Sequence, residues 1–143
     1  MTPRIAAFAA FIGLLVVALL APGRSQAKGV RLGEEFTMHI GNRVKVTGPK
    51  IVIDFVDVVE DSRCPTDVVC AWAGNAKIHL QLQWKGREPK AMLLNTLQTP
   101  VLDKFKKYVV KLVKLEPLPV SNGQIDKGDY VATLIVVPAD SEG

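Results

Sequence analysis

Few side chains in this chain could carry out covalent chemistry: two cysteines, two histidines and the three serines that follow residue 27. Nucleophilic catalysis by serine needs a nearby base, usually histidine. His39 and His79 each lie in a strand-like run, and no nucleophile-elbow motif surrounds a serine. Cys64 and Cys70 cannot act as thiolates once they are bridged. We therefore expect no catalytic site, no enzyme activity and no cofactor.

Metal binding and carboxylate chemistry are also poorly supported by the spacing. A zinc site built from both cysteines and both histidines would need closer cysteines than C-x5-C provides. The acidic residues from Asp54 to Asp67 follow no calcium-loop pattern. Asp54 and Asp57 have opposite parity, so a regular strand would place them on opposite sides. The sequence therefore predicts no metal site and no glycosidase pair.

The N-terminus predicts export. Arg4 precedes an almost wholly apolar run over residues 5–21, which Pro22-Gly23 ends, and Ser25-Gln26-Ala27 fits the small-x-small cleavage rule. We therefore expect a signal peptide over 1–27 and a periplasmic or secreted mature protein. An uncleaved membrane anchor is the alternative, although the run has only the minimum length for a span.

The mature chain would be one domain over residues 28–143, with a loose tail at 139–143. Loss of Arg4 and Arg24 lowers the basic count from 18 to 16 against 14 acidic residues, so the mature net charge is about +2. This balance and the lack of a glycine-rich phosphate loop predict neither a nucleic-acid nor a nucleotide partner. A weakly cationic exported protein can still meet anionic lipids or glycans.

The two cysteines most simply form one disulfide in an exported protein. A Cys64–Cys70 bridge would close a ring of seven residues. A loop so short is stabilised by only about 2 kcal/mol. We therefore expect the bridge to set local shape more than global stability.

Period-two alternation covers most of the mature chain and predicts β-strands. Residues 35–46 alternate on both sides of Gly41-Asn42, which is typical of a hairpin. Further strands are expected at residues 51–59, 77–85, 91–95 and 129–137. Residues 102–115 are ambiguous: we favour a strand over 108–116 after a short turn or helical piece near 103–106, and an amphipathic helix is the alternative.

These elements predict an all-β protein, an immunoglobulin-like or Greek-key β-sandwich of about seven strands with one short-range disulfide. Tyr130 follows a glycine turn and enters the last strand. This position resembles a tyrosine corner, in which the phenol bonds back to upstream backbone. An ordinary turn with a half-buried tyrosine is the alternative.

The segment from Asp61 to Asn75 reads D-S-R-C-P-T-D-V-V-C-A-W-A-G-N. It resembles a group of uncharacterised exported bacterial proteins with an R-C-P…C-x-W-x-G loop early in a small β domain. The residues that carry this resemblance are Arg63, Cys64, Pro65, Cys70, Trp72 and Gly74, and more loosely the stretch from Leu115 to Pro119. The resemblance implies a periplasmic or secreted β protein and supports the strand at 108–116. It implies no activity.

We therefore expect a non-catalytic binding domain that contacts an envelope or extracellular protein through this loop. A rigid loop with an aromatic residue lowers the ordering cost of binding. The candidate contact residues are Arg63, Pro65, Trp72 and Asn75. The alternative is a structural envelope protein in which the loop only staples the fold. A protease inhibitor presenting Pro65 to Val69, or an enzyme, ranks below both.

A lysine-rich run is the second candidate site. Its proposed members are Lys104, Lys106, Lys107 and Lys111, with Lys114 beyond them. Such a patch could hold an anionic lipid head group or an acidic glycan. Lysines on an edge strand also discourage association between sheets, which is the alternative role.

Overall fold

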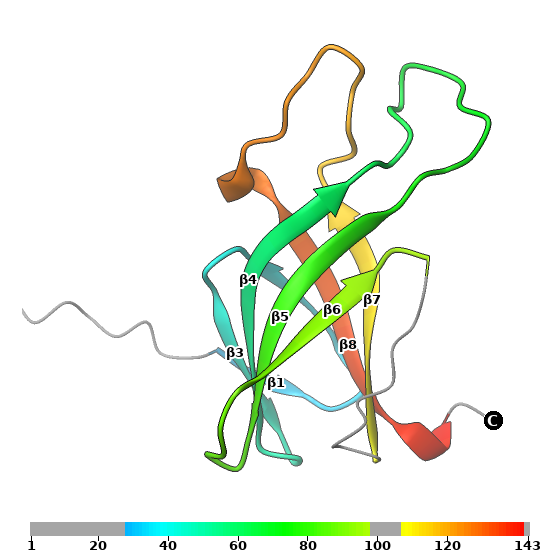
Figure 1. The fold of residues 1–143 in the computed structure, drawn as a ribbon. Coiled ribbons are helices and arrows are strands. Elements are labelled where there is room, and N and C mark those ends of the chain that lie inside the picture. Colours follow the sequence, from blue (N-terminus) through cyan, green and yellow to red (C-terminus); the bar gives the residue numbers. More distant parts are fainter. Residues whose placement is uncertain (1–27, 98–106, 142–143) are drawn as a thin grey trace, which may run out of the picture.

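The computed structural model describes residues 28–97 and 107–141 as two β-sheets (Figure 1). The strands are β1 (Lys28–Arg31), β2 (Glu35–His39), β3 (Arg43–Thr47), β4 (Ile51–Asp61), β5 (Ala76–Trp84), β6 (Lys90–Asn95), β7 (Tyr108–Glu116) and β8 (Val131–Pro138). One sheet has the order β1-β3-β4-β5-β6 and the other β2-β8-β7. The all-β fold is confirmed, with eight strands in place of about seven. The predicted signal peptide lies outside the described residues.

Alternating side chains of both sheets form one apolar core. In β4 and β5 the inward residues include Ile53, Phe55 and Leu80, all fully buried. The smaller sheet adds Met38 and Leu134 from the other side. Successive side chains of a strand point to opposite faces, so a strand with one buried face has apolar residues at alternating positions. The buried residues are the alternating apolar positions from which the strands were predicted.

The predicted hairpin over residues 35–46 is wrong. β2 pairs with β8 in the small sheet, whereas β3 pairs with β1 and β4 in the large one. Gly41-Asn42 is a turn, but it carries the chain from one sheet to the other. The Gly41 N–H donates to the Phe55 carbonyl at 2.7 Å, and the Phe55 N–H donates to the Asn42 carbonyl at 3.1 Å. These bonds attach the turn to β4, between the strand that joins the small sheet and the strand that joins the large one.

The ambiguous segment is a strand where the structure describes it. β7 covers Tyr108–Glu116, with a bulge between Leu112 and Lys114, and this excludes a helix there. The turn or helical piece expected at 103–106 falls outside the described residues. The predicted tail begins with a 3-10 turn, η2 (Ala139–Ser141), and the Ala139 N–H donates to the Lys107 carbonyl at 2.8 Å. The start of the tail is thus attached to the fold.

A β-bulge corrects the expected placement of Asp54 and Asp57. The register of β4 against β5 shifts between Phe55 and Asp57. Asp54 therefore lies opposite Gln81, and Asp57 lies opposite His79. Since Gln81 and His79 are two residues apart on β5, the bulge places both aspartates on the same outer face.

Two long connections meet at one end of the molecule. Residues 62–75 join β4 to β5, and residues 117–130 join β7 to β8 through the 3-10 turn η1 (Lys127–Asp129). Figure 1 shows both loops extending beyond the strand ends on the same side. We call residues 62–75 the first loop and residues 117–126 the second loop. Within the part of the chain that the structure describes, no helix is long and apolar enough to cross a membrane.

Candidate functional site

The predicted disulfide between Cys64 and Cys70 is present, with an S–S distance of 2.09 Å and a Cα–Cα distance of 5.9 Å. Ladder-like bonds continue from β4 and β5 into the first loop. The Ser62 N–H donates to the Asn75 carbonyl at 2.7 Å, and the Cys64 N–H donates to the Ala73 carbonyl at 2.8 Å. The loop therefore has a narrow paired neck and a bridged ring above it.

Gly74 allows the two sides of this neck to approach. Its φ is +70°, in the region that favours glycine. A Cβ atom at this position would lie 1.8 Å from the Ser62 carbonyl oxygen and 2.9 Å from the Arg63 Cα. Any side chain here would separate the two sides of the neck. The glycine is thus a geometric requirement of the motif.

Arg63 is almost buried and binds within the protein, with 9% of its side chain exposed. Its guanidinium forms a two-pronged contact with the Asp61 carboxylate, with Nε to Oδ1 at 2.8 Å and Nη2 to Oδ2 at 2.6 Å. It also donates to the carbonyls of Leu115 at 2.5 Å and Pro117 at 2.9 Å. Arg63 therefore connects the base of the first loop to the end of β7 and the start of the second loop.

Asp61 receives a third partner from the last part of the chain. The Tyr130 hydroxyl donates to Asp61 Oδ2 at 3.0 Å. Burial raises the pKa of the Asp61 carboxyl, but the hydrogen bonds and charge of Arg63 and the bond from Tyr130 outweigh it, so the pKa lies below its ordinary value. Burial, together with the nearby Asp61 carboxylate, raises the pKa of Tyr130. We call Asp61, Arg63 and Tyr130 the latch.

The latch differs from the predicted tyrosine corner. The phenol of Tyr130 binds a carboxylate 69 residues upstream in place of backbone near its own turn. The nearby Arg63 favours this arrangement because it holds Asp61 ionised, and a carboxylate is a stronger acceptor than a carbonyl. Tyr130 keeps the structural role expected of it, with a different partner.

Asn75, another candidate contact residue, is also bound inside the protein. Its amide nitrogen donates to Asn95 Oδ1 at 3.0 Å, and its oxygen accepts from the Thr96 hydroxyl at 3.0 Å. Pro65 is half-buried within the disulfide ring. Of the four predicted contact residues, only Trp72 is free to meet a partner, with 79% of its surface exposed.

A second loop, which the sequence did not predict as part of the site, lies beside the first. The Thr66 N–H donates to the Pro119 carbonyl at 2.9 Å. The Asp67 carboxylate accepts from the Ser121 N–H at 2.8 Å and from the Ser121 hydroxyl. These bonds from Ser121 lower the pKa of Asp67. Local patterns could not reveal this pairing, because the partners are more than 50 residues apart.

Large apolar side chains project from both loops. Val69 is 101% exposed, and Val68, Leu118 and Val120 are also exposed. We call Val68, Val69, Trp72, Leu118 and Val120 the apolar tip. Exposed apolar clusters of this kind mark interaction sites more often than isolated surface residues do. The arrangement is suited to binding, because the latch fixes the base of the tip and its apolar side chains remain open.

The lysine run does not join this surface. Lys107 is exposed at the start of β7 and Lys111 is half-buried on that strand, whereas Lys104 and Lys106 lie outside the described residues. Lys107 comes directly before β7 and lies nine residues from Glu116 at the loop end, which at about 3.4 Å per residue is about 31 Å. Lys107 and the apolar tip therefore belong to separate candidate sites, whereas Lys114 lies near the loop end of β7 and pairs with Glu116 at 2.7 Å.

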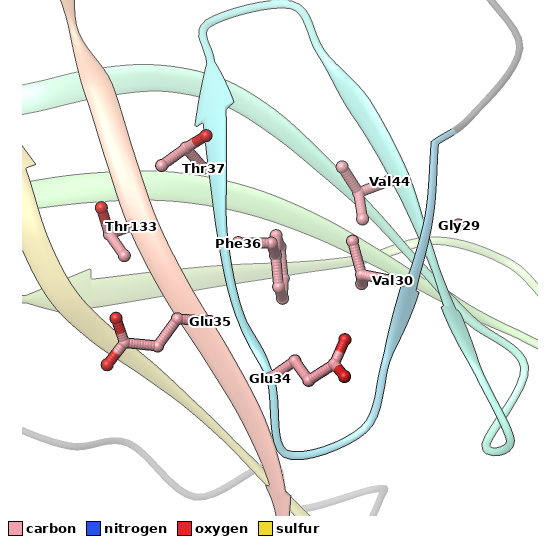
Figure 2. Close-up of a pocket in the computed structure, with 8 residues that line it drawn as sticks. All are labelled: Gly29, Val30, Glu34, Glu35, Phe36, Thr37, Val44 and Thr133. Carbon is pink, nitrogen blue, oxygen red and sulfur yellow. The ribbon is translucent and has the colours of Figure 1, made fainter.

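A hollow of about 570 Å³ opens between β1 and β2. Figure 2 shows Val30, Phe36 and Val44 grouped together with the Glu34 carboxylate beside them, whereas the Glu35 carboxylate points to the other side of β2, near Thr133. Its other lining residues are Gly29, Thr37 and Thr133. Neither histidine lines it. The hollow thus combines a group of apolar side chains with one carboxylate beside them, that of Glu34.

The histidines lie apart. His39 is exposed on β2, and His79 is half-buried on the outer face of β5 opposite Asp57. Among residues 28–97 and 107–141, no group of three histidine, cysteine or acidic side chains is arranged to hold a metal ion. Comparison with known proteins adds no assignment: no family model, no curated protein and no solved structure matches this chain.

We expect Arg63→Ala to lower the free energy of unfolding by about 3 kcal/mol or more, because it leaves the nearly buried Asp61 unpaired. Arg63→Lys keeps the charge but loses the planar fork, so an intermediate loss is expected. Urea denaturation measures both. Arg43→Ala is the control: it removes the exposed Arg43–Asp54 pair and should cost less than about 1 kcal/mol. Equal losses for Arg63→Ala and Arg43→Ala would contradict the latch.

Gly74→Ala should destabilise the protein more than Gly86→Ala does. Both positions have nearly the same φ, +70° and +72°, so they share the same backbone penalty. A Cβ at Gly86 has no atom within 4 Å, whereas at Gly74 it meets the Ser62 carbonyl. We expect an excess of about 2 kcal/mol for Gly74→Ala, in the range of backbone strain and overpacking. Denaturation midpoints compare the two, and equal midpoints would contradict the close approach at the neck.

The latch predicts a defined pH dependence. Because the pKa of Asp61 is lower in the folded than in the unfolded state, its stabilisation is fully present above about pH 4 and is lost as the pH falls through the folded-state pKa. Between neutral pH and about pH 3, the wild type should therefore lose more free energy of unfolding than Asp61→Asn, which does not titrate. Urea denaturation at both pH values tests this. Parallel losses would show that Asp61 is not the responsible group.

Proposed function

We propose that this protein is an exported, non-catalytic binding domain whose contact surface is the Cys64–Cys70 loop, extended by the second loop. The observation that carries the proposal is the full exposure of Val69 and the 79% exposure of Trp72 on a loop that is bridged and latched. Trp is one of the residue types enriched among binding hot spots. The apolar tip is thus the surface where a contact would release the most ordered water.

The fixed base of the loops supports this function. Binding through a mobile loop loses conformational entropy, whereas a preorganised loop avoids much of that cost. The disulfide, the Arg63 contacts and the Asp67–Ser121 bonds all restrict the two loops before any partner arrives. The tip therefore needs little further ordering on contact.

A purely structural role is the alternative proposal, and the latch favours it. Arg63 and Asn75 direct their polar groups inward and hold the two loops to the sheets. If the motif were only a staple, Trp72 would have no partner. Both proposals give the latch the role of holding the two loops to the sheets. Only the binding proposal requires the apolar tip to contact a partner.

Export is part of the proposal. The disulfide supports an oxidising compartment, because such bonds persist outside the reducing cytosol. The apolar N-terminal segment with its small-x-small site supports cleavage after Ala27 and a periplasmic or secreted location.

The finer fold assignment, an immunoglobulin-like Greek-key sandwich, also stays a proposal. The pairing of β2 with β8 supports it, because a Greek key brings strands far apart in the chain together in one sheet. The consecutive antiparallel pairing of β3, β4, β5 and β6 supports a sandwich without favouring that particular topology.

The proposal is tested by retention of envelope material on the immobilised chain 28–143, which contains all eight strands. A detergent-free envelope fraction of the source is applied, and retained proteins and phospholipids are identified by mass spectrometry. We expect Val69→Ser/Trp72→Ala to abolish retention without loss of folding, because both side chains are exposed. Leu93→Ala is the control, since Leu93 is 53% exposed on β6 and is not one of the residues of the apolar tip.

Circular dichroism and urea denaturation confirm that each variant is folded. Retention that is lost only in the tip variant supports a binding domain. Equal retention by the wild type and both variants, or no retention by the wild type, would reject a contact role for the apolar tip. The purely structural role of the loop would then remain. Arg63 is kept intact in this experiment, because its loss would alter the base of both loops.

A further inference from the structure

We infer that the apolar tip docks into the interfacial region of a lipid bilayer. This inference rests on the proposed function and specifies its ligand. Ten large apolar side chains are exposed in the described part of the chain, and five of them are the residues of the tip. They come from two loops at one end of the molecule (Figure 1), so they can enter one plane together.

The composition of the two loops fits a bilayer. The two loops, residues 62–75 and 117–126, contain three charged side chains: Arg63 is almost buried, Asp126 lies where the second loop meets η1, and Asp67 is exposed near the tip. Elsewhere the surface carries many charges, since 22% of the chain is charged. A projecting surface with few charges loses little hydration energy on entering the boundary between head groups and acyl chains. Trp72 is the residue type that gathers at this level, with an apolar ring and one N–H donor.

The polar side chains of the first loop favour a bilayer over a protein partner. Ser62, Arg63, Thr66, Asp67 and Asn75 all bond within the protein. A protein interface of ordinary size contains about ten direct hydrogen bonds. The first loop has already used these donors and acceptors internally. What it presents outward is chiefly aliphatic and indole surface, which a bilayer accepts without specific hydrogen bonds.

Asp67 limits the depth of insertion and sets the lipid preference. Its carboxylate is exposed beside Ser121, one residue from the apolar tip. A charge in the hydrocarbon core is costly, so insertion should stop with Asp67 at the head groups. Its negative sign gives no attraction to anionic lipids. Binding should therefore occur on zwitterionic membranes and change little with salt.

The lysine run would behave differently. Lys107 lies at the far end of β7 from the second loop, so it cannot approach the membrane together with Trp72. Binding through the lysines would require anionic lipid and would weaken with salt. The two mechanisms can thus be separated by vesicle composition alone.

The test is co-sedimentation of chain 28–143 with vesicles of phosphatidylethanolamine and phosphatidylcholine. Trp72→Ala should lower the partition coefficient about tenfold or more, because it removes the largest exposed apolar side chain of the tip. Leu118→Ala should lower it by a smaller factor, because it removes a smaller apolar side chain from the second loop. Leu93→Ala, outside the tip, should leave it unchanged.

The depth of insertion of Trp72 into the bilayer is measured by tryptophan fluorescence of the Trp84→Phe variant, in which Trp72 is the only tryptophan. Vesicles should shift its emission to the blue, and a quencher near the head groups should quench it more than one at the bilayer centre. The reciprocal Trp72→Phe chain reports Trp84. Trp84 pairs with Ile51 at the opposite end of β5 from the first loop and should not shift.

Neutral-vesicle binding that is lost in Trp72→Ala and kept in Leu93→Ala supports the inference. Absence of wild-type binding, or binding that needs anionic lipid and survives Trp72→Ala, overturns it. If envelope proteins are still retained through the tip in the earlier experiment, the proposed binding function stands without the bilayer. If neither vesicle binding nor retention of envelope material depends on the tip, both the bilayer inference and the proposed binding function are rejected.

Discussion

The ion pair between Asp61 and Arg63 is the contact on which the arrangement of the two loops depends. Both side chains are about nine-tenths buried, so neither charge could remain there without the other. The fork of Arg63 has donors beyond those that Asp61 accepts, and the carbonyls of Leu115 and Pro117 take them. A single guanidinium thereby joins β4, β7 and the second loop, and Tyr130 adds the start of β8.

This contact divides the first loop into two parts with different chemistry. The lower part is polar and bound: Gly74 permits the close neck, and Asn75 attaches it to the end of β6. The upper part is apolar and open, with Val69 and Trp72 outermost. The latch and the disulfide hold the upper part away from the sheets.

Local patterns predicted the strands well and the contacts between them poorly. Alternation identified β4, β5 and β8 because their inward residues are uniformly apolar. The hairpin over 35–46 failed because alternation cannot show which sheet a strand joins, and β1 was too short to be noticed. Arg63 illustrates the same limit within the site. Its type and position marked it as important, but only the fold shows that Leu115, 52 residues away, is one of its partners.

The apolar tip is difficult to explain by stability alone. An exposed Trp contributes little to folding and raises the risk of aggregation. A purely structural role requires Arg63, Gly74 and the disulfide. A polar residue at position 72 would be equally compatible with that role. The second loop repeats the pattern with Leu118 and Val120, and Asp67 and Ser121 hold it beside the first. Two independently encoded loops with the same exposed chemistry, fixed side by side, are better accounted for by a shared contact than by the requirements of the fold.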